Sequence, residues 1–135
     1  MFRQIYKRGI YTATIYVDGS FIKFNDKVFR KSAGIGLYFP NGEHYNVSEK
    51  VHAISANYSE MMAVYRAIKI CDLLAINGAI YTDSEYVIRE INSKHNGIFL
   101  KHVKAHQYLH SSIPGHDHSV GNAIADTLAK YGAKM

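Results

Sequence analysis

The sequence predicts an α/β fold in which one mixed β-sheet carries helices on both of its faces. Three segments rich in β-branched and aromatic side chains come first, separated by turn signals. Segments of helical and strand period then alternate to the end of the chain. This order indicates three antiparallel strands followed by parallel strands joined through crossover helices. We therefore expect five strands and three helices in the order β-β-β-α-β-α-β-α.

Three strands are expected in the first part of the chain. The first, residues 12–17 (TATIYV), is β-branched and aromatic and ends at the turn signal DG. The second, residues 33–39 (AGIGLYF), is closed by PNG, which is typical of a tight hairpin turn. Residues 43–51 alternate loosely and are expected to pair with the second strand in the antiparallel sense.

Helical and strand periods alternate after Asn57. Apolar side chains then recur at three- and four-residue spacing and indicate one helical face, which ends at a stop signal, NG: Met61, Tyr65, Ile68, Cys71 and Ala75. Residues 79–82 form a short buried strand, and a helix follows through about Ser93.

The last part of the chain is predicted to hold one strand and one helix. Residues 94–97 are expected to turn, and residues 98–103 to form the fifth strand. Residues 107–119 are rich in Ser, Pro, Gly and His and are interpreted as a loop. The helical period returns over residues 121–131.

Composition favours a globular, non-membrane protein of one domain over residues 1–135. Hydrophobic residues make up 47% and charged residues 20% of the chain. No apolar run approaches the roughly 20 residues of a membrane span, and the start MFRQIYKRG is too polar for a secretory signal. We expect a monomer inside the cell, in the cytoplasm or nucleus, where the single Cys71 stays reduced. The net charge of +5 is compatible with a polyanionic partner.

Four acids each have a structural interpretation when taken alone. Asp18 suits a turn, and Glu60 stands three residues after Asn57, as in a capping box. Asp83 suits a helix N-cap, and Asp126 in an early helical turn suits the macrodipole. Their joint arrangement is harder to explain this way. If the first and fourth strands are parallel neighbours, Asp18 and Asp83 meet at one edge of the sheet.

Five sequence blocks then point to a known family. IYVDGSF, ANYSEMMAVYRAI, YTDSEYVI, VKAH and GNAIADTLAK stand in the order seen in ribonuclease H of type 1, including the ribonuclease H domains of reverse transcriptases. The chain resembles this family from about Thr12 to Ala133. The resemblance implies a ribonuclease H-like fold. It also implies an endonuclease that cuts the RNA strand of RNA–DNA hybrids and leaves 5′-phosphate and 3′-hydroxyl ends.

The resemblance assigns Asp18, Glu60, Asp83 and Asp126 to the four metal-binding carboxylates of the family. Mg²⁺ and Mn²⁺ prefer oxygen ligands, and two such ions about 4 Å apart clamp both sides of an in-line phosphoryl displacement. By this likeness Asp18 bridges the ions and Asp126 helps to hold the ion that activates water. Glu60 and Asp83 hold the ion that stabilises the departing 3′ oxygen. Clustered acids repel each other without cations, so at least one is expected to titrate at high pH.

A histidine is the fifth catalytic group that the resemblance implies. His106, in VKAH, matches the mobile catalytic histidine of the family, and an imidazole suits proton transfer near neutral pH. His116 and His118 are alternatives for this role, and both are also compatible with solvated loop residues. A structural Zn²⁺ site that joins His102, His106 or His110 is disfavoured because no cysteine lies nearby.

Substrate contacts are implied at polar positions near the acids. Asn57 matches an Asn that in the family contacts the RNA strand, where only the 2′-hydroxyl tells RNA from DNA. Ser20, Ser84 and Asn122 are similarly placed. Glu85 departs from the pattern, because many members carry Gln there and an ionised Glu repels phosphate.

Two other functional classes compete with the nuclease. Loss of one of the four acids would favour a non-catalytic ribonuclease H-like module attached to a polymerase. The chain keeps all four. A 3′–5′ exonuclease of the wider superfamily usually opens with an Asp-x-Glu pair, which DGS lacks. The short segment between Asp83 and His106 has no room for the basic lobe that most cellular members insert there, which predicts a weak grip on the hybrid.

Overall fold

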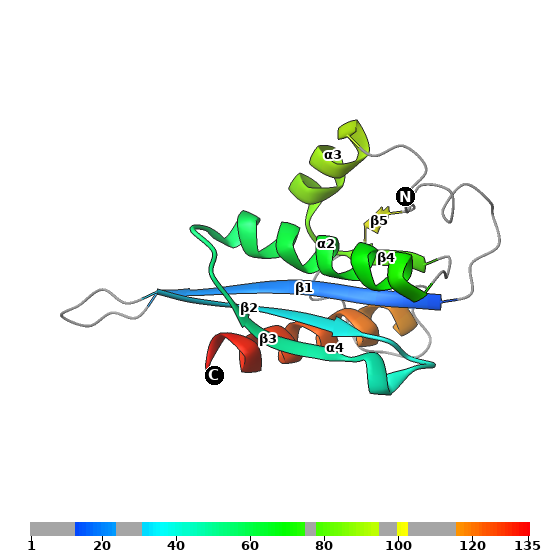
Figure 1. The fold of residues 1–135 in the computed structure, drawn as a ribbon, viewed down its shortest axis with the longest axis horizontal. Coiled ribbons are helices and arrows are strands. Elements are labelled where there is room, and N and C mark those ends of the chain that lie inside the picture. Colours follow the sequence, from blue (N-terminus) through cyan, green and yellow to red (C-terminus); the bar gives the residue numbers. More distant parts are fainter. Residues whose placement is uncertain (1–12, 24–30, 75–77, 95–99, 103–115) are drawn as a thin grey trace.

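A five-stranded mixed sheet with helices on both faces forms the centre of the molecule (Figure 1). The computed structural model describes residues 13–23, 31–74, 78–94, 100–102 and 116–135. The strand order is β3-β2-β1-β4-β5, with β1 at the centre. The predicted α/β class and the order of the elements are therefore confirmed.

The elements follow one another as three strands, then helices alternating with strands. Their bounds are β1 Ala13–Lys23, β2 Lys31–Tyr38, β3 Val47–Val51, α2 Ala56–Leu74, β4 Gly78–Thr82, α3 Glu85–Lys94, β5 Leu100–His102 and α4 His116–Ala133. Strands β1, β2 and β3 pair in the antiparallel sense, whereas β1 with β4 and β4 with β5 pair in parallel. Among the helices that the structure describes, none is long and apolar enough to cross a membrane.

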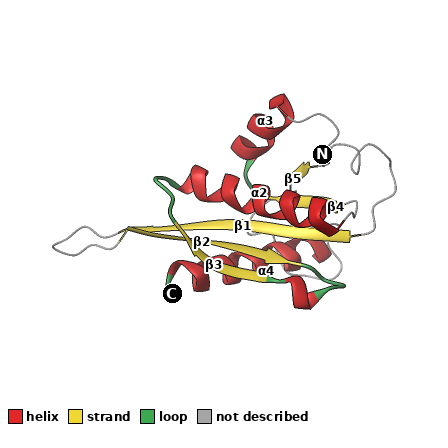
Figure 2. Ribbon diagram, in the orientation of Figure 1, coloured by secondary structure: helices red, strands yellow, loops and turns green. Residues whose placement is uncertain are grey.

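Helices α2 and α3 lie on the same face of the sheet (Figures 1 and 2). Large apolar side chains of the strands and of these two helices form the core. Alternate strand residues point to this face because the side-chain period of a strand is two. The core comprises Ile15, Val17, Ile35, Leu37, Phe39 and Ile80 from and beside the strands, Ala63, Val64, Ala67, Ile68 and Cys71 from α2, and Val87 and Ile91 from α3. Of the helical face predicted from the three- and four-residue spacing, Ile68 and Cys71 are buried and Met61 packs against the core. The prediction is wrong for Tyr65, which is exposed, and Ala75 lies outside the described residues.

Small residues line the opposite face of β2, where α4 packs (Figure 1). A Cβ added to Gly34 would lie 2.2 Å from the backbone nitrogen of Ala133, and one added to Gly36 would lie 2.2 Å from the carbonyl oxygen of Ala125. The hydroxyl of Ser32 donates a hydrogen bond to the carbonyl of Ala133. Helix α4 therefore lies directly on the backbone of the sheet.

The first strand is longer than predicted. It continues through Asp18 and Gly19 to Lys23, and Gly19 pairs with Ile35 of β2. The interpretation of DG as the end of the strand is wrong. A Cβ on Gly19 would lie 2.5 Å from the backbone nitrogen of Glu60, so glycine is needed there for the close approach of α2.

The connection between β2 and β3 contains an extra element. The predicted turn at PNG is present, because the N–H of Gly42 donates to the carbonyl of Phe39 at 3.1 Å. The next residues form a 3-10 helix, η1 (Glu43–Tyr45), instead of continuing as a strand. The third strand therefore begins at Val47 and not at residue 43.

The last helix begins earlier than its apolar period indicated. It starts at His116, so residues 116–119, which were predicted as loop, are helical. Ser119 is buried and the ring of His118 packs on the sheet, so tertiary contacts stabilise this first turn despite its polar sequence. Most of the predicted turn at 94–97, the ends of the fifth strand and the rest of the predicted loop lie outside the described residues.

We predict that Gly36→Ala lowers the free energy of unfolding by about 2 kcal/mol, because the added methyl group forces α4 away from β2. Urea denaturation measures this change. Gly42→Ala is the matched control, since the nearest atoms to its Cβ belong to the movable side chain of Tyr45, at 3.2 Å, and no backbone atom lies as close. Equal stability of the two variants would contradict the tight packing of α4.

Candidate active site

The pairing of β1 with β4 brings two acids to the same place on the sheet. Tyr16 of β1 is the register partner of Tyr81 of β4. Asp18 and Asp83 each follow two residues later, so the same register carries them to neighbouring positions. Because a strand has a side-chain period of two, each acid continues the face of its tyrosine. Strand β4 ends at Thr82, and β1 continues past Asp18.

Helix α2 supplies a third acid, Glu60, through a close contact with β1. The backbone N–H of Gly19 donates to Oε1 of Glu60 and also lies 3.0 Å from Oδ1 of Asp18. The contact requires glycine at position 19, as described above. The same glycine therefore allows both the approach of the helix and the hydrogen bond that orients the carboxylate.

The N-cap of α2 is Ser55, and this corrects the predicted capping box. The Oγ of Ser55 accepts from the N–H of Tyr58 at 3.1 Å. Asn57 is already inside the first turn, so it does not cap the helix together with Glu60. Its side chain is exposed and remains available for contacts outside the chain.

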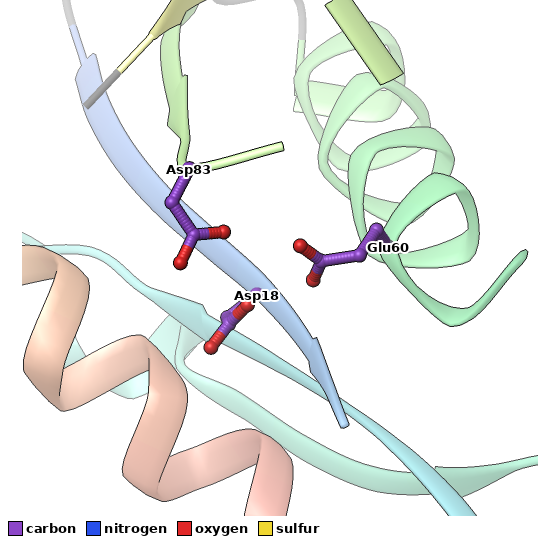
Figure 3. A group of neighbouring side chains, drawn as sticks. All are labelled: Asp18, Glu60 and Asp83. Carbon is purple, nitrogen blue, oxygen red and sulfur yellow. The ribbon is translucent and has the colours of Figure 1, made fainter. Parts of the chain in front are cut away.

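The carboxylates of Asp18, Glu60 and Asp83 converge (Figure 3). One oxygen atom from each lies within 4.8 Å of the others. The three side chains come from a central strand, a helix and the end of a neighbouring strand, and they point toward one another. Residues distant in sequence thus form one compact group of oxygen atoms.

Helix α4 adds a fourth acid from the other side of β1. The side chain of Asp126 forms a hydrogen bond with Asp18. Its Oδ2 atom also lies 3.0 Å from Nζ of Lys130, one helical turn later. The pKa of Lys130 is raised because its ammonium group is hydrogen-bonded to Asp126. Asp18 is therefore in contact with acids of both α2 and α4.

Burial and mutual repulsion keep two of these acids protonated at unusually high pH. Burial, followed by the charge of Glu60 and hydrogen bonding with it, raises the pKa of Asp18 to about 12. Burial also raises the pKa of Glu60 to about 7, with Asp83 adding to the rise and a hydrogen bond from Asp18 opposing it. The expectation that at least one acid titrates high is confirmed. At neutral pH Asp18 is the proton donor in its hydrogen bond with Glu60.

The donor set fits hard divalent cations. Asp18 is only 5% exposed and shares its surroundings with carboxylates that repel its ionised form. A cation such as Mg²⁺ or Mn²⁺ replaces the proton as the source of positive charge, and both ions prefer carboxylate oxygen ligands. The residues present thus suit this metal chemistry.

Ser84 caps α3 and leaves Asp83 free to join the cluster. The Oγ of Ser84 accepts from the N–H of Val87 at 3.2 Å, and the N–H of Ser84 donates to Oγ1 of Thr82 at 3.1 Å. The capping role considered for Asp83 therefore belongs to Ser84. The following Glu85 is exposed at the first position of the helix.

Two other polar positions suggested by sequence, Ser20 and Asn122, lie on elements that also carry acids of the cluster. Ser20 follows Asp18 by two residues on β1 and is half-buried. Asn122 is buried on α4, one turn before Asp126. His106 lies outside the described residues, as does His110, and His116 is the first residue of α4.

Sequence reasoning missed two residues of the site. Lys130 pairs with Asp126 at a spacing of four, which is a recognisable helical signal. Gly19 was interpreted as a turn residue, and no local pattern distinguishes a turn glycine from one required by a helix packed across the strand.

Comparison with known proteins identifies the family. The family profile described as RNase H matches residues 11–99, about two thirds of the chain. The chain belongs to the RNase H family. This match includes Asp18, Glu60 and Asp83 of the candidate site and ends before Asp126.

One curated relative and several solved structures resemble this RNase H family chain. A ribonuclease H from Saccharomyces cerevisiae is 29% identical over 158 residues, covering 88% of this chain and 45% of the yeast protein. The chain thus spans about half the length of that relative. The solution structure of the PFV RNase H domain superimposes with a TM-score of 0.73 at 24% identity, covering 93% of this chain and 96% of the domain.

A foamy viral protease-reverse transcriptase in complex with dsDNA is also similar, with a TM-score of 0.67 at 26% identity, covering 91% of this chain and 94% of that one. These likenesses confirm the predicted ribonuclease H-like fold.

We predict that Asp18→Asn stabilises the metal-free protein at pH 8 by roughly 3–6 °C in Tm, about 1–2 kcal/mol. The pKa values of Asp18 and Glu60 are raised in the folded state, so the unfolded chain releases protons that the folded protein keeps. The contribution of Asp18 to stability therefore falls as pH rises from about 3.8 toward 12, and that of Glu60 falls as pH rises from about 4.5 toward 7.

Thermal unfolding in chelator at pH 5, 6.5 and 8 measures this effect. The side-chain amide of the new Asn can donate a hydrogen bond to Glu60, as the protonated Asp18 does. The substitution also removes the carboxyl group whose ionisation is unfavourable. Glu43→Gln, at an exposed position on η1, is the control and is expected to leave the pH dependence unchanged. A wild-type Tm that rises between pH 5 and 8 would contradict the raised pKa values.

Proposed function

We propose that this RNase H family chain is an endonuclease that hydrolyses the RNA strand of RNA–DNA hybrids, with two Mg²⁺ or Mn²⁺ ions held by Asp18, Glu60, Asp83 and Asp126. The observation that carries the proposal is the convergence of three acids, from α2, from the end of β4 and from α4, on the buried carboxyl group of Asp18. Keeping these acids together opposes stability in the metal-free protein. A purely structural role does not account for this arrangement.

The protein's own contribution is to hold four carboxylates close to one another. Asp18 contacts the other acids from the centre of the sheet, so it is the residue suited to be shared between two ions. Glu60 and Asp83 lie on one side of it, and Asp126 reaches it from α4. Bound cations supply Lewis-acid activation of water and neutralise charge on the scissile phosphate.

Hybrid recognition is proposed to begin at the start of α2. Asn57 is exposed one helical turn before Glu60, so its amide lies beside the candidate centre and is free to donate and accept. A contact with a 2′-hydroxyl at that position distinguishes RNA from DNA. Ser20, Ser84 and Asn122 are proposed as further substrate contacts. The net charge of +5 is compatible with a polyanionic substrate inside the cell.

Proton transfer is proposed for His106, which immediately follows the fifth-strand region in VKAH. An imidazole there is suited to protonate the departing 3′ oxygen. His118 is engaged elsewhere: its Nδ1 atom lies 2.8 Å from the hydroxyl oxygen of Tyr16. That contact argues against His118 as the mobile group.

We predict that the wild type cleaves an RNA–DNA hybrid with Mg²⁺ or Mn²⁺, and that Asp18→Asn reduces the rate by at least about 10³-fold. The neutral amide cannot bridge two cations. Matched hybrid, double-stranded RNA and double-stranded DNA are compared with and without chelator. Ends are mapped for 5′-phosphate and 3′-hydroxyl groups.

The folded state of Asp18→Asn is checked by its thermal transition, so that lost activity is not lost structure. Glu43→Gln serves again as the exposed acidic control and is expected to cleave like the wild type. Cleavage by Asp18→Asn at the wild-type rate would refute the two-metal proposal. Equal cleavage of all three duplexes would refute the hybrid as the preferred substrate.

We predict that His106→Ala lowers kcat by roughly 10²-fold, within the usual range for general acid–base groups. His116→Ala and His118→Ala at saturating metal are expected to change kcat much less. Single-turnover cleavage at pH 6 to 9 measures this, and loss of the alkaline limb of the profile is expected for His106→Ala, because a general acid must be protonated to act. A wild-type rate in His106→Ala combined with a crippled His116→Ala would move the role to the later histidine.

A further inference from the structure

An aromatic cluster lies beside the acid cluster on the face of the sheet that α4 covers. The ring of Tyr16 stacks on Tyr81 at 5.2 Å and 24°, and on Tyr38 at 6.2 Å and 27°. The imidazole of His118, in the first turn of α4, stacks on Tyr81 at 4.5 Å and 27°. Three strands and one helix thus meet through aromatic rings.

One polar contact fixes the orientation of this cluster. The hydroxyl oxygen of Tyr16 and Nδ1 of His118 are 2.8 Å apart, while the rings themselves lie 5.9 Å apart and are tilted by 50°. Tyr16 is only 5% exposed, so this hydrogen bond is largely shielded from water. Stacking restrains one side of the imidazole and the hydrogen bond restrains its rotation.

The backbone of α4 is as close to Tyr16 as its side chain permits. A Cβ on Gly121 would lie 2.5 Å from the ring of Tyr16. The N-terminal turns of α4 therefore rest on this ring, with His118 on one side and Gly121 above it. A change in the position of the Tyr16 ring or in the orientation of the His118 imidazole is therefore expected to move the first turns of α4.

The register links this aromatic contact to the candidate metal ligands. Tyr16 and Tyr81 are partners in the sheet, and each precedes an acid of the site, Asp18 or Asp83, by two residues. His118 precedes Asp126 by eight residues on α4, about 12 Å along the axis at 1.5 Å per residue. The contacts of helix α4 with β1 thus include an aromatic one at Tyr16 and a carboxyl one at Asp18.

We propose that His118 is a positioning residue, whose imidazole, held by Tyr16 and Tyr81, fixes the N-terminal turns of α4 and thereby places Asp126 for divalent cations. This inference rests on the proposed function, since it takes Asp126 to be a metal ligand. The residue acts through α4 and is not a catalytic group. The proposed role of His118 is therefore different from proton transfer.

Direct metal binding tests the proposal without substrate. Mn²⁺ is titrated calorimetrically into the metal-free full chain as wild type, His118→Ala, His118→Asn and His44→Ala. We expect affinity to fall roughly 10-fold in His118→Ala, within the range for residues that orient ligands from outside the coordination sphere. His118→Asn is expected to recover most of it, because the Asn amide places a polar atom near the position of Nδ1.

His44 is the matched control. It is an exposed histidine whose ring also packs on a tyrosine, Tyr45, at 4.0 Å, and it lies on η1 between β2 and β3. His44→Ala is expected to bind Mn²⁺ like the wild type. Tyr16→Phe provides a milder change that removes only the hydroxyl and is expected to weaken Mn²⁺ binding a few-fold, even where His118→Ala folds poorly.

Hybrid cleavage at varied Mn²⁺ then separates positioning from proton transfer. His118→Ala should need about 10-fold more Mn²⁺ for half-maximal rate and should approach the wild-type kcat at saturation. All variants are assayed well below their Tm values. Unchanged Mn²⁺ affinity in both His118→Ala and Tyr16→Phe would overturn the proposal, and so would a kcat defect that saturating Mn²⁺ does not relieve. A wild type that binds Mn²⁺ but cleaves no hybrid would refute the proposed function and leave the positioning role standing.

Discussion

The burial of Asp18 at the centre of the sheet, within reach of three other acids, is the constraint on which the rest of the structure depends. A carboxyl group so placed loses hydration and is repelled by its neighbours when ionised, and its pKa rises to about 12. The surrounding fold must supply enough stability to hold the group there. It does so through the apolar layer between the sheet and α2, formed by side chains such as Val17, Leu37 and Ile68.

The helices pack differently on the two faces of the sheet. On the α2 face, large side chains fill the space and contribute most of the apolar burial. On the α4 face, glycines have no side chains to separate the helix from the strand, so the helix lies on the backbone of β2. Gly19 extends the same principle to the other face, where the start of α2 approaches β1. Close approach is what allows the short side chains of Asp and Glu to meet from opposite sides of a strand.

The position of α4 on the sheet is fixed by several contacts of different chemistry. Ser32 and Ser48 donate to carbonyl groups of Ala133 and Leu128 in its C-terminal half. Tyr16 and Gly121 fix its N-terminal half, and Asp126 lies between these regions. The acid is therefore presented by a helix restrained on both sides, which suits a residue whose oxygen atoms must be placed accurately in a cluster.

The sequence by itself determined the class of fold, the order of its elements and the four acids that meet. Strand and helix periods report which faces are buried, and they located α2, β4 and most of β2 closely. The family resemblance in YTDSEYVI and GNAIADTLAK singled out Asp83 and Asp126, although each also suits a helix terminus. Local patterns failed where a residue's role depends on a distant partner.

Only the tertiary structure decided the length of β1, the start of α4 and the roles of the residues that hold the acids in place. Gly19 has the sequence signature of a turn, yet it continues a strand because α2 packs against it. His118 stands in a polar stretch typical of a loop, yet the rings of Tyr16 and Tyr81 hold it in a helix. In both cases the deciding interaction is with a segment more than 35 residues away (Glu60 and Tyr81, respectively), and no local periodicity records such a contact.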